Sequence, residues 1–550
     1  GIYLYINSAE NYLYSKNNQT PTTHPDITGA GTYAYHNYEY PAETTPEFEQ
    51  NIEIIATPYD YYYIPSQDAG GGDEPTPDTP DTPDTPDTPD DPVNPDNPDL
   101  GTSSVPFLTF VNRGVYSVQN LDFDTGHIDY VLSQHGSYQA DTIQGSISID
   151  PVVVVDSNNT NYIVEDAFIG TDNGIELVDN LYMFSPTLKQ NEAGNIDAVL
   201  TMKDMHDLVE NQSLASYLSS NYALNNASEM FNALKTTETK SAFDDIIKQK
   251  FGLGLIPNLA KQNLDVEKTV NNEISTDIMQ KTDEQNRRRV NLLTYGNKVS
   301  AKHQSDGYKD RVIAAYGFND TDIGNNLRFG LGLSTTFVDS DFDGDSSRYN
   351  TILEIFAPIS SHSDKMVAMV KPKVGFARGR YRRVEAGAVH KADTKEYYFG
   401  ADTAVKQNYN LDDIVELEPM VGFNLTDMYV GNMRENNQGL RVGSKNVVSA
   451  QSVLGVDIKK NIELNSDNGI SLSAGGKYYH EFGNKYRSTV SADGMEGHYQ
   501  VTDNRLQRNY GLLGVKAQYN YKELSLGSAV YVPLEQKHKE YYMFNLGYIF

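Results

Sequence analysis

The chain has 550 residues, enough for several domains, and carries a net charge of −31. It contains no Cys, which excludes disulfide frameworks, thiolate metal sites and Cys nucleophiles. Its first hundred residues hold one Lys, no Arg and 19 acidic residues, which excludes nucleic acid as a partner there because phosphates would be repelled. No window of about 18 apolar residues occurs, so no transmembrane helix is predicted.

The N-terminal part divides into two polar segments. Because the sequence begins at Gly1 rather than Met, we expect a fragment or a processed form, and we interpret residues 1–72 as the remnant of a larger upstream domain. Residues 73–100 repeat Thr-Pro-Asp and contain nine Pro, which forbid a helix, while the like charges favour an extended chain. This segment is predicted to be a disordered linker.

Two further segments differ in the spacing of their apolar residues. Residues 101–200 alternate apolar and polar positions in short runs separated by turn signals such as Asp172-Asn173-Gly174. They predict a small all-β module, either a sandwich or the last rungs of a β-solenoid. Residues 201–257 have apolar residues at helical spacing, for example Phe243, Ile246 and Ile247, and predict a helical connector.

Residues 258–306 are predicted to form one long polar helix. Val266, Val270, Ile274 and Ile278 recur at helical spacing within a segment rich in amides and charges. Its only nearby Pro is Pro257, at the position before the first turn, where Pro is tolerated.

Residues 307–550 alternate with period two, with apolar side chains on one face and small or polar ones on the other. An even number of such strands of about ten residues is typical of an outer-membrane β-barrel. A soluble β-sandwich also alternates, but it would need two packed sheets and would not need aromatic residues at strand ends or a terminal aromatic residue. The twelve runs lie near residues 308–318, 326–338, 348–359, 366–379, 394–408, 413–428, 440–458, 469–482, 487–501, 506–520, 523–533 and 540–550.

A polar helix, then twelve strands, then a terminal Phe resembles the plan of monomeric (type Va) autotransporter translocators. Local matches are Pro419–Asn424, Ala474–Gly483 and Leu546–Phe550, and the resemblance covers about residues 260–550. It implies a mainly β fold, a 12-stranded antiparallel barrel in the outer membrane of a Gram-negative cell with a central pore helix. The preceding segments would then be the end of an extracellular passenger.

The resemblance implies export of the chain's own passenger by type V secretion. The expected partners are outer-membrane lipid, the passenger itself and the barrel assembly machinery, which would contact Phe550. We expect a monomer without cofactor or metal and no enzyme activity other than self-cleavage, since other activity would lie in an upstream passenger. The alternative is an outer-membrane pore or adhesin barrel with an exposed N-terminal arm, which would gain nothing from a plug-length helix.

Polar residues on the inner face of the barrel are expected to bind polar residues of the pore helix. The lumen-facing candidates are Arg328, Glu416, Glu418, Lys477 and Glu481, and the helix candidates are Glu273, Lys281, Arg287 and Arg288.

The pair Asn271-Asn272 on the predicted pore helix is a candidate self-cleavage site. In one branch of the family the passenger is released between two consecutive Asn on this helix. The side-chain amide of Asn271 would attack its own backbone carbonyl, and Glu416 or Glu418 could take the proton. The other interpretation is a pair of polar residues on a wet helix.

Two charged runs have both a structural and a functional interpretation. Asp339–Asp345 resembles the start of an EF-hand loop but has Asn350 at the twelfth position, so we expect a solvated acidic periplasmic turn, with weak calcium binding as the alternative. Arg378–Arg383 lies beside a strand end and predicts either a solvated turn or contact with anionic lipid headgroups.

Overall fold

The computed structural model describes most of the chain after residue 107 and two short strands before it. Residues 1–72 and the linker at 73–100 therefore lie outside the described residues, apart from β1 (Leu4–Ile6) and β2 (Asn11–Ser15). The described ranges are 4–6, 11–15, 108–112, 114–124, 128–155, 157–281, 284–301, 305–412, 415–483, 485–504, 506–534 and 540–550.

The described chain forms two compact units: residues 1–203 with 232–239, and residues 204–231 with 240–550. In the first unit, neighbouring strands of the series β3, β6, β7 and β8 pair in parallel, and β4 and β5 also pair with β7 in parallel. Successive parallel strands joined by short connections are the pattern of a β-solenoid, whereas the sandwich alternative would consist of antiparallel sheets. The bounds are β3 (Leu108–Asn112), β4 (Val115–Ser117), β5 (Asn120–Asp122), β6 (Ile128–Leu132), β7 (Ser137–Ile149) and β8 (Asn161–Leu177).

The interior of this solenoid is aromatic. Ring centroids of neighbouring aromatic side chains lie 5.2 to 6.4 Å apart, mostly edge to face. The solenoid ends at β9 (Phe184–Gln190) and β10 (Ile196–Met202), which pair antiparallel to each other. The residues that form the stack are Phe110, Tyr116, Phe123, Tyr130, Tyr138 and Phe168.

A helical segment follows, as the apolar spacing predicts for residues 201–257. Each helix buries an apolar stripe; in α4 this stripe contains Phe243 and Ile247. Within the described residues, no helix is both long enough and apolar enough to cross a membrane. The helices are α1 (Met205–Leu208), α2 (Gln212–Ala223), α3 (Ser228–Lys235), α4 (Lys240–Lys250), the 3-10 turn η4 (Ile256–Asn258) and α5 (Leu259–Ile278).

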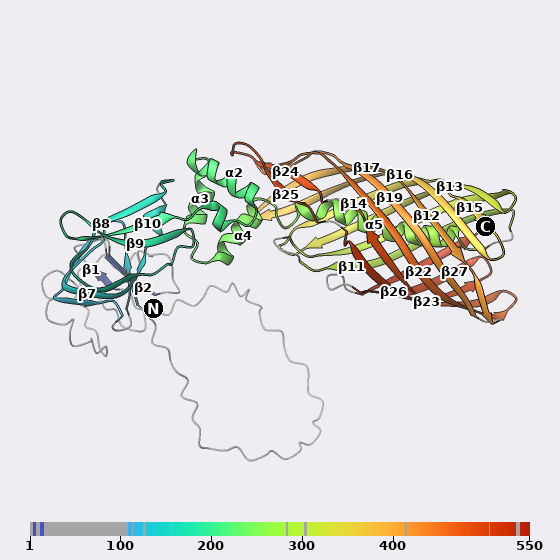
Figure 1. Cartoon of the computed structure of the whole chain (residues 1–550), viewed down its shortest axis with the longest axis horizontal. Coiled ribbons are helices and arrows are strands. Elements are labelled where there is room, and N and C mark those ends of the chain that lie inside the picture. Colours follow the sequence, from blue (N-terminus) through green and yellow to red (C-terminus); the bar gives the residue numbers. More distant parts are fainter. Residues whose placement is uncertain are drawn as a thin grey trace, which may run out of the picture. The chain divides into compact units, whose positions relative to one another are not determined.

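The C-terminal part is a closed antiparallel barrel of twelve strands around α5 (Figure 1). Pairing of β11 with β28 and of β12 with β13 leaves no free edge in the ring. The short strands β15 (Ile359–His362) and β18 (Tyr409–Asp412) extend the wall. The twelve strands are β11 (Asn286–Val299), β12 (Tyr308–Gly324), β13 (Leu327–Phe342), β14 (Ser347–Phe356), β16 (Met366–Glu385), β17 (Ala388–Gln407), β19 (Val415–Val430), β22 (Lys445–Asn465), β23 (Asn468–Glu481), β26 (Asn509–Tyr521), β27 (Leu524–Pro533) and β28 (Tyr541–Ile549).

The predicted number of strands is confirmed, but two of the predicted assignments are wrong. The pore helix ends at Ile278 instead of continuing to 306, and residues 286–299 form β11. The run at 487–501 belongs instead to a separate four-stranded sheet, outside the barrel ring. Inward Arg and Asn alternate with outward Val and Leu in β11, so its polar composition masks a period of two. The separate sheet consists of β20 (Met433–Arg434), β21 (Leu440–Val442), β24 (Arg487–Ala492) and β25 (Tyr499–Thr502).

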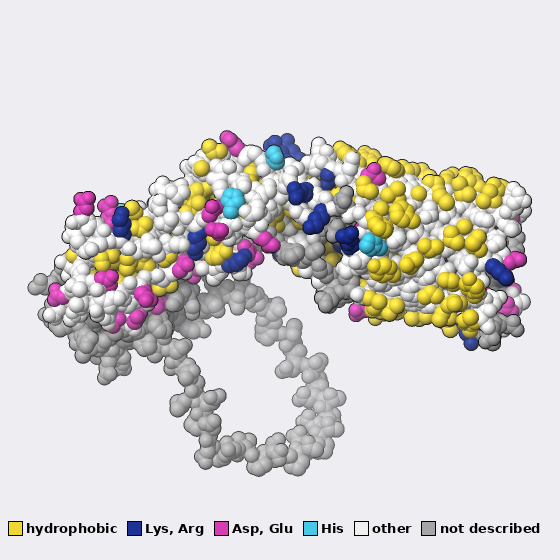
Figure 2. Space-filling model, in the orientation of Figure 1, with side chains coloured by type: hydrophobic (Ala, Val, Ile, Leu, Met, Phe, Trp, Pro, Cys, Tyr) yellow, Lys and Arg dark blue, Asp and Glu magenta, His cyan; other side chains and the backbone are white. Residues whose placement is uncertain are grey.

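The outer face of the barrel is apolar. Hydrophobic side chains are spread over the visible face of the barrel in Figure 2, and the exposed apolar residues of the strands are mainly Leu, Ile, Val and Phe. Exposed aromatic side chains occur towards both ends, such as Tyr349 and Tyr429 near one end and Tyr521 and Tyr548 near the other. This arrangement is that of a barrel whose outside meets lipid and whose aromatic girdles meet the two interfaces.

The two ends of the barrel differ. We call the end that contains Phe550 and the start of β11 the C-terminal end. It has two-residue turns such as 325–326 and 466–467. The other end, here the mouth, carries the longer connections, the four-stranded sheet and the start of α5. The Asp339–Asp345 segment lies at the mouth, whereas the prediction placed it at the same end as the barrel termini. The reason is that β11 adds a strand and moves the turns between β12 and β23 to the opposite end.

Candidate functional site

Helix α5 crosses the barrel lumen, and its sequence suits that place. It contains neither Gly nor Pro, and Pro257 precedes its first turn. Charged and amide side chains of α5 are buried along with the apolar ones, including Lys261, Gln262 and Glu267. A helix satisfies its own backbone hydrogen bonds, so it can fill a polar lumen without a partner strand.

Near the start of α5, amides of the helix meet a buried ion pair of the wall. Arg348 of β14 donates to the backbone oxygen of Leu259 at 2.9 Å and to Gln262 Oε1 at 3.1 Å. The same guanidinium pairs with Glu396 of β17 at 2.8 Å, and Asn263 of the helix donates to Glu396 at 2.6 Å. The charges are thus compensated by each other and by helix amides, as buried charges require.

Asn271 lies in the middle of a charged network. Its side-chain nitrogen donates to Glu267 Oε1 at 3.0 Å and to Glu354 Oε2 of β14 at 2.9 Å. Lys371 of β16 donates to the backbone oxygen of Asn271 at 3.2 Å and also to its side-chain oxygen. The amide nitrogen therefore faces two carboxylates, and the backbone carbonyl faces an ammonium group.

The wall holds these groups in place. Asp402 of β17 pairs with Lys371 at 3.1 Å and with Lys373 at 2.9 Å, and Lys373 also pairs with Glu267. The hydroxyl of Tyr398 donates to Glu354 at 2.9 Å. The charged groups named here thus have partners that restrict their orientation, which is the condition for preorganised chemistry.

The far end of α5 is anchored by arginines of the first strand. Arg287 of β11 donates to the backbone oxygens of Asp277 and Ile278 at 3.2 and 3.1 Å, where the last carbonyls of a helix lack partners. It also pairs with Asp320, which Arg328 contacts at 2.8 Å. Positive charge at a helix C-terminus is favourable, so this cluster locks the helix end to the wall.

Asn272 faces a different side of the lumen. Its amide donates to the hydroxyl of Tyr479 at 3.3 Å, and it borders a polar cavity of about 510 Å³. Glu416 and Glu418 line the same cavity, and Glu418 pairs with Lys406 at 3.1 Å. The prediction that one of these two glutamates takes the proton from Asn271 is wrong, because the carboxylates in contact with Asn271 are those of Glu267 and Glu354.

The other predicted helix–wall contacts are partly wrong. Arg287 and Arg288 belong to β11 rather than to the helix, and Arg288 points outward. Glu273 does lie on α5 and binds the wall, through Lys516 at 3.3 Å and the Tyr531 hydroxyl at 2.8 Å. Lys281 follows the helix and donates to the backbone oxygen of Asp364.

The predicted wall residues face the interior, and one of them, Lys477, interacts electrostatically with Glu273 of the helix as predicted. The others for which contacts are seen bind groups of the wall instead. Arg328 binds Asp320, as described above. Glu481 binds the Ser449 hydroxyl at 2.6 Å and the backbone nitrogen of Ala450 at 2.9 Å. Lys477 lines the same cavity as Asn272. The alternation therefore identified the inward face correctly but not most of the contacts made there.

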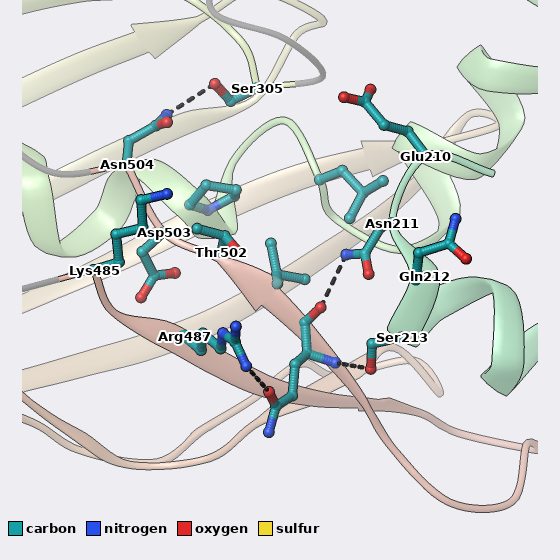
Figure 3. A pocket seen from close by; sticks show the side chains of 14 residues that line it. Glu210, Asn211, Gln212, Ser213, Ser305, Lys485, Arg487, Thr502, Asp503 and Asn504 are labelled. Carbon is teal, nitrogen blue, oxygen red and sulfur yellow. Dashed lines mark hydrogen bonds between the residues drawn. The ribbon is translucent and has the colours of Figure 1, made fainter. Parts of the chain in front are cut away.

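The mouth of the barrel is covered by residues that precede α5. Asn211 donates to the backbone oxygen of Gln500 at 2.9 Å, and Ser213 accepts from the Gln500 nitrogen at 2.9 Å (Figure 3). The rings of Tyr217 and Tyr499 lie 5.1 Å apart beside Phe251. Helix α2 and the four-stranded sheet thus form a cap, and residues of both line a pocket of about 770 Å³.

The cap also contains buried charge. Lys248 pairs with Asp306 at 2.5 Å, and Asn258 donates to the backbone oxygen of Asp306 at 2.9 Å. Burial raises the pKa of the Asp306 carboxyl, while the Lys248 ammonium acts in the opposite direction. The loop before β12 is therefore tied to the start of the pore helix.

Among the described residues, no group of three or more His, Asp or Glu side chains converges as a metal site would require. In the EF-hand-like segment, Asp339 and Asp341 pair with Arg311 at 2.7 and 3.0 Å, and Asp343 accepts from the Gly307 nitrogen at 3.0 Å. Weak calcium binding there stays a prediction.

The residues that contact Asn271 were missed from the sequence, although a signal for them exists. Glu354, Lys371 and Asp402 all occupy inward positions of strands whose outward neighbours are mostly apolar. A charge at such a position, deep within a strand, indicates a lumen-facing residue. The sequence does not show that three such strands bring their charges to one turn of the helix.

Residues 282–529 match the family model described as Autotransporter beta-domain. A search of curated proteins finds no match. Three solved structures with a similar arrangement are autotransporter transport domains. The translocator domain of NalP from Neisseria meningitidis has 10% identity and a TM-score of 0.43, with 53% of this chain and 99% of that chain covered.

The other two structures have comparable values. The beta domain of the Bordetella autotransporter BrkA has 14% identity and a TM-score of 0.37, with 48% of this chain and 99% of that chain covered. The transport unit of AIDA-I from Escherichia coli has 11% identity and a TM-score of 0.34, with 51% and 95% covered.

Proposed function

Residues 282–529 belong to the autotransporter beta-domain family, and on that premise we propose that this barrel, an outer-membrane translocator of type V secretion, releases its passenger by cutting the chain inside the lumen. The barrel itself lies in the outer membrane and exports the chain's own N-terminal passenger. Its cargo in this scheme is residues 1–72, the linker 73–100 and the module 101–200, with 201–257 as connector. The chain would act as a monomer.

The mouth of the barrel is assigned to the cell exterior. Outer-membrane barrels have short periplasmic turns and longer extracellular loops, and the longer connections here are at the mouth. Helix α5 begins at that end and leads to β11 at the C-terminal end. A chain that enters the lumen from outside and returns as the first strand has its preceding residues outside the cell.

The proposed cut is between Asn271 and Asn272. The side-chain nitrogen of Asn271 attacks the backbone carbonyl carbon of the same residue, and its proton passes to Glu354 or Glu267. The carbonyl oxygen gains negative charge beside Lys371, which donates to it at 3.2 Å. The bond to Asn272 then breaks, its nitrogen takes up a proton, and the upstream fragment ends in a five-membered succinimide.

The observation that most strongly supports this reaction is the arrangement of charges around Asn271. Asn271 has its attacking nitrogen against carboxylates and its carbonyl against an ammonium group, which are the two polarities that the cyclisation needs. Asn263 lies on the same helix and also contacts a carboxylate, but the hydrogen bond from the wall reaches its side-chain oxygen, from Asn350 at 2.5 Å. It is therefore the matched control.

Mass spectrometry of the full chain from outer membranes tests the cut. We expect a barrel fragment that starts at Asn272, its loss in Asn271→Asp, and its retention in Asn263→Ala. Glu354→Gln should slow the cut by about 10²–10⁴-fold and Lys371→Met by about 10²–10³-fold. An intact helix still joined to the upstream chain in the unmodified protein would rule the reaction out.

Assembly is proposed to depend on Phe550. This side chain is 66% exposed at the end of the last strand, and its backbone nitrogen bonds to the oxygen of Arg288 on β11 at 2.9 Å. An exposed aromatic at the periplasmic end of the closing strand is a feature that the barrel assembly machinery could contact before the ring closes.

A further inference from the structure

The outer face of β16 changes from apolar to basic along its length. Outward side chains from Met366 to Phe376 include Val370 and Val374 and carry no charge. The length of this stretch matches the 9–11 or so residues that a tilted strand needs to cross the hydrocarbon layer. The next outward positions, towards the mouth, are Arg378, Arg380 and Arg382.

The neighbouring strand β17 repeats the change at the same height. Its outward residues opposite the three arginines are Lys395, Asp393 and Lys391. We call these six residues the basic face; they are Arg378, Arg380, Arg382, Lys391, Asp393 and Lys395.

The pairing within the basic face is unfavourable for the isolated protein. Arg378 stands directly opposite Lys395, and Arg382 stands directly opposite Lys391. Like charges directly across two strands destabilise a sheet. The single acid, Asp393, pairs with Arg380 at 2.7 Å and also interacts electrostatically with Arg378 and Lys395, so one carboxylate faces five cations.

The two like-charge pairs gain little compensation from the adjoining strand. Arg382 donates to the backbone oxygen of Asp345 at 3.0 Å, a contact that brings no opposite charge from a side chain. Elsewhere at the mouth the protein does balance such a cation: Arg311 of β12 pairs with Asp339 and Asp341 of β13 at 2.7 and 3.0 Å. The basic face therefore presents charge that an external anion can neutralise.

The depth of the basic face identifies the kind of anion. Phe376 stands opposite Tyr397, with ring centroids 5.0 Å apart, and the Arg378–Lys395 pair is the next outward pair along the strands. Aromatic rings of this type lie at the boundary between hydrocarbon and headgroups. Cations one step beyond that boundary lie at the level of the headgroups.

From this geometry we infer that the basic face binds the phosphate groups of a phosphorylated glycolipid in the outer leaflet. The inference rests on the proposed orientation, with the mouth outside the cell. Arginine offers a planar fork of donors that fits phosphate oxygens, and Arg378 with Lys395 forms one cradle while Arg382 with Lys391 forms the second. Lipid bound in this way relieves both like-charge contacts.

The test uses native mass spectrometry of the purified full chain titrated with lipid A that carries two phosphates. We expect Arg378→Gln/Lys395→Gln to bind this lipid about 10- to 30-fold more weakly, since each cation near an anionic surface contributes appreciably. The matched control is Arg311→Gln, an exposed arginine near the same end that already has acidic partners. Migration of unboiled protein on a gel verifies that each variant is folded.

Five results would overturn the inference, and the first three concern the variants and the phosphate group. They are unchanged binding in the double variant, equal weakening in Arg311→Gln, or equal binding of phosphate-free lipid with the same acyl chains. Displacement of the lipid by inorganic phosphate at about 10 mM, or equal binding of phosphatidylglycerol, would also contradict a site for an outer-leaflet glycolipid. The same spectra report whether the chain is cut after Asn271, so failure of the self-cleavage proposal is seen separately.

Discussion

The solenoid of the first unit and the barrel of the second place their apolar side chains on opposite sides of their strands. In the solenoid, aromatic rings such as Tyr138 and Phe168 are fully buried, while most charged side chains face solvent. In the barrel, Arg348 and Glu396 are fully buried, and Leu331 and Phe399 are each 61% exposed. The same alternating pattern thus gives two interiors, because one unit is surrounded by water and the other by lipid.

This difference determines what each interior can do. Packed aromatic rings stabilise a shape through area buried and ring geometry, but they offer no group that can move a proton. The lumen brings carboxylates and ammonium groups together out of bulk water, where their interactions are stronger. Chemistry on the chain itself is therefore expected in the barrel, and mechanical support in the solenoid.

Among the changes that affect the barrel but not the solenoid, deletion of Phe550 is expected to have the largest effect. The barrel closes only when β28 pairs with β11, so loss of the terminal aromatic should leave the chain in the periplasm, where it is degraded. The measurement is the amount of barrel in the outer-membrane fraction. Phe550→Tyr, which keeps an aromatic ring, should assemble normally. Unchanged surface levels of the deletion would count against a role for Phe550.

A smaller but still large effect is expected from Arg348→Met in the lumen. The substitution leaves Glu396 buried without its cation, which should cost about 3–5 kcal/mol of stability. The temperature at which the unboiled gel band disappears measures it, since a closed barrel resists SDS until heated. The double variant Arg348→Met/Glu396→Met should recover most of the loss. If the single and double variants behave alike, buried charge compensation is not what holds this part of the lumen.

The smallest effects compare one substitution at two places. Ile143→Val in the buried solenoid interior should cost about 0.5–1.5 kcal/mol, because a methylene-sized gap remains. Ile355→Val on the outer face of the barrel should cost less, since Ile355 is 51% exposed and lipid fills the space. Urea unfolding of the solenoid and the gel-shift temperature of the barrel measure the two. A greater loss at Ile355 would contradict a lipid-facing outer wall.

The strand pattern could be predicted from the sequence because each strand shows its alternation locally. The number twelve came out right through two errors that cancel: β11 was taken as helix, and residues 487–501 were taken as a barrel strand. Arg287 and Arg289 make β11 look like the continuation of a polar helix. Only closure of the ring, with β11 between β28 and β12, assigns those residues to the wall.

The candidate cleavage site was likewise only partly predictable from the sequence. The Asn271-Asn272 pair and its place on a pore helix were visible in the sequence, as was the inward face of each strand. The partners of Asn271 come from α5 itself, from β14 and from β16, so up to 100 residues separate groups that lie within hydrogen-bond distance. Glu416 and Glu418 satisfy the same inward alternation but belong to another side of the lumen.

The sequence by itself therefore determined which residues alternate, which segment near residue 270 is helical and which face of each strand meets lipid. These features depend on the pattern of residues two to four positions apart in the chain. The tertiary structure alone decided which inward charges meet Asn271, which end of the barrel carries the Asp339–Asp345 turn, and that Arg378 stands opposite Lys395. Those facts depend on the register and order of strands around a closed ring, where one added strand moves the turns that follow it to the other end.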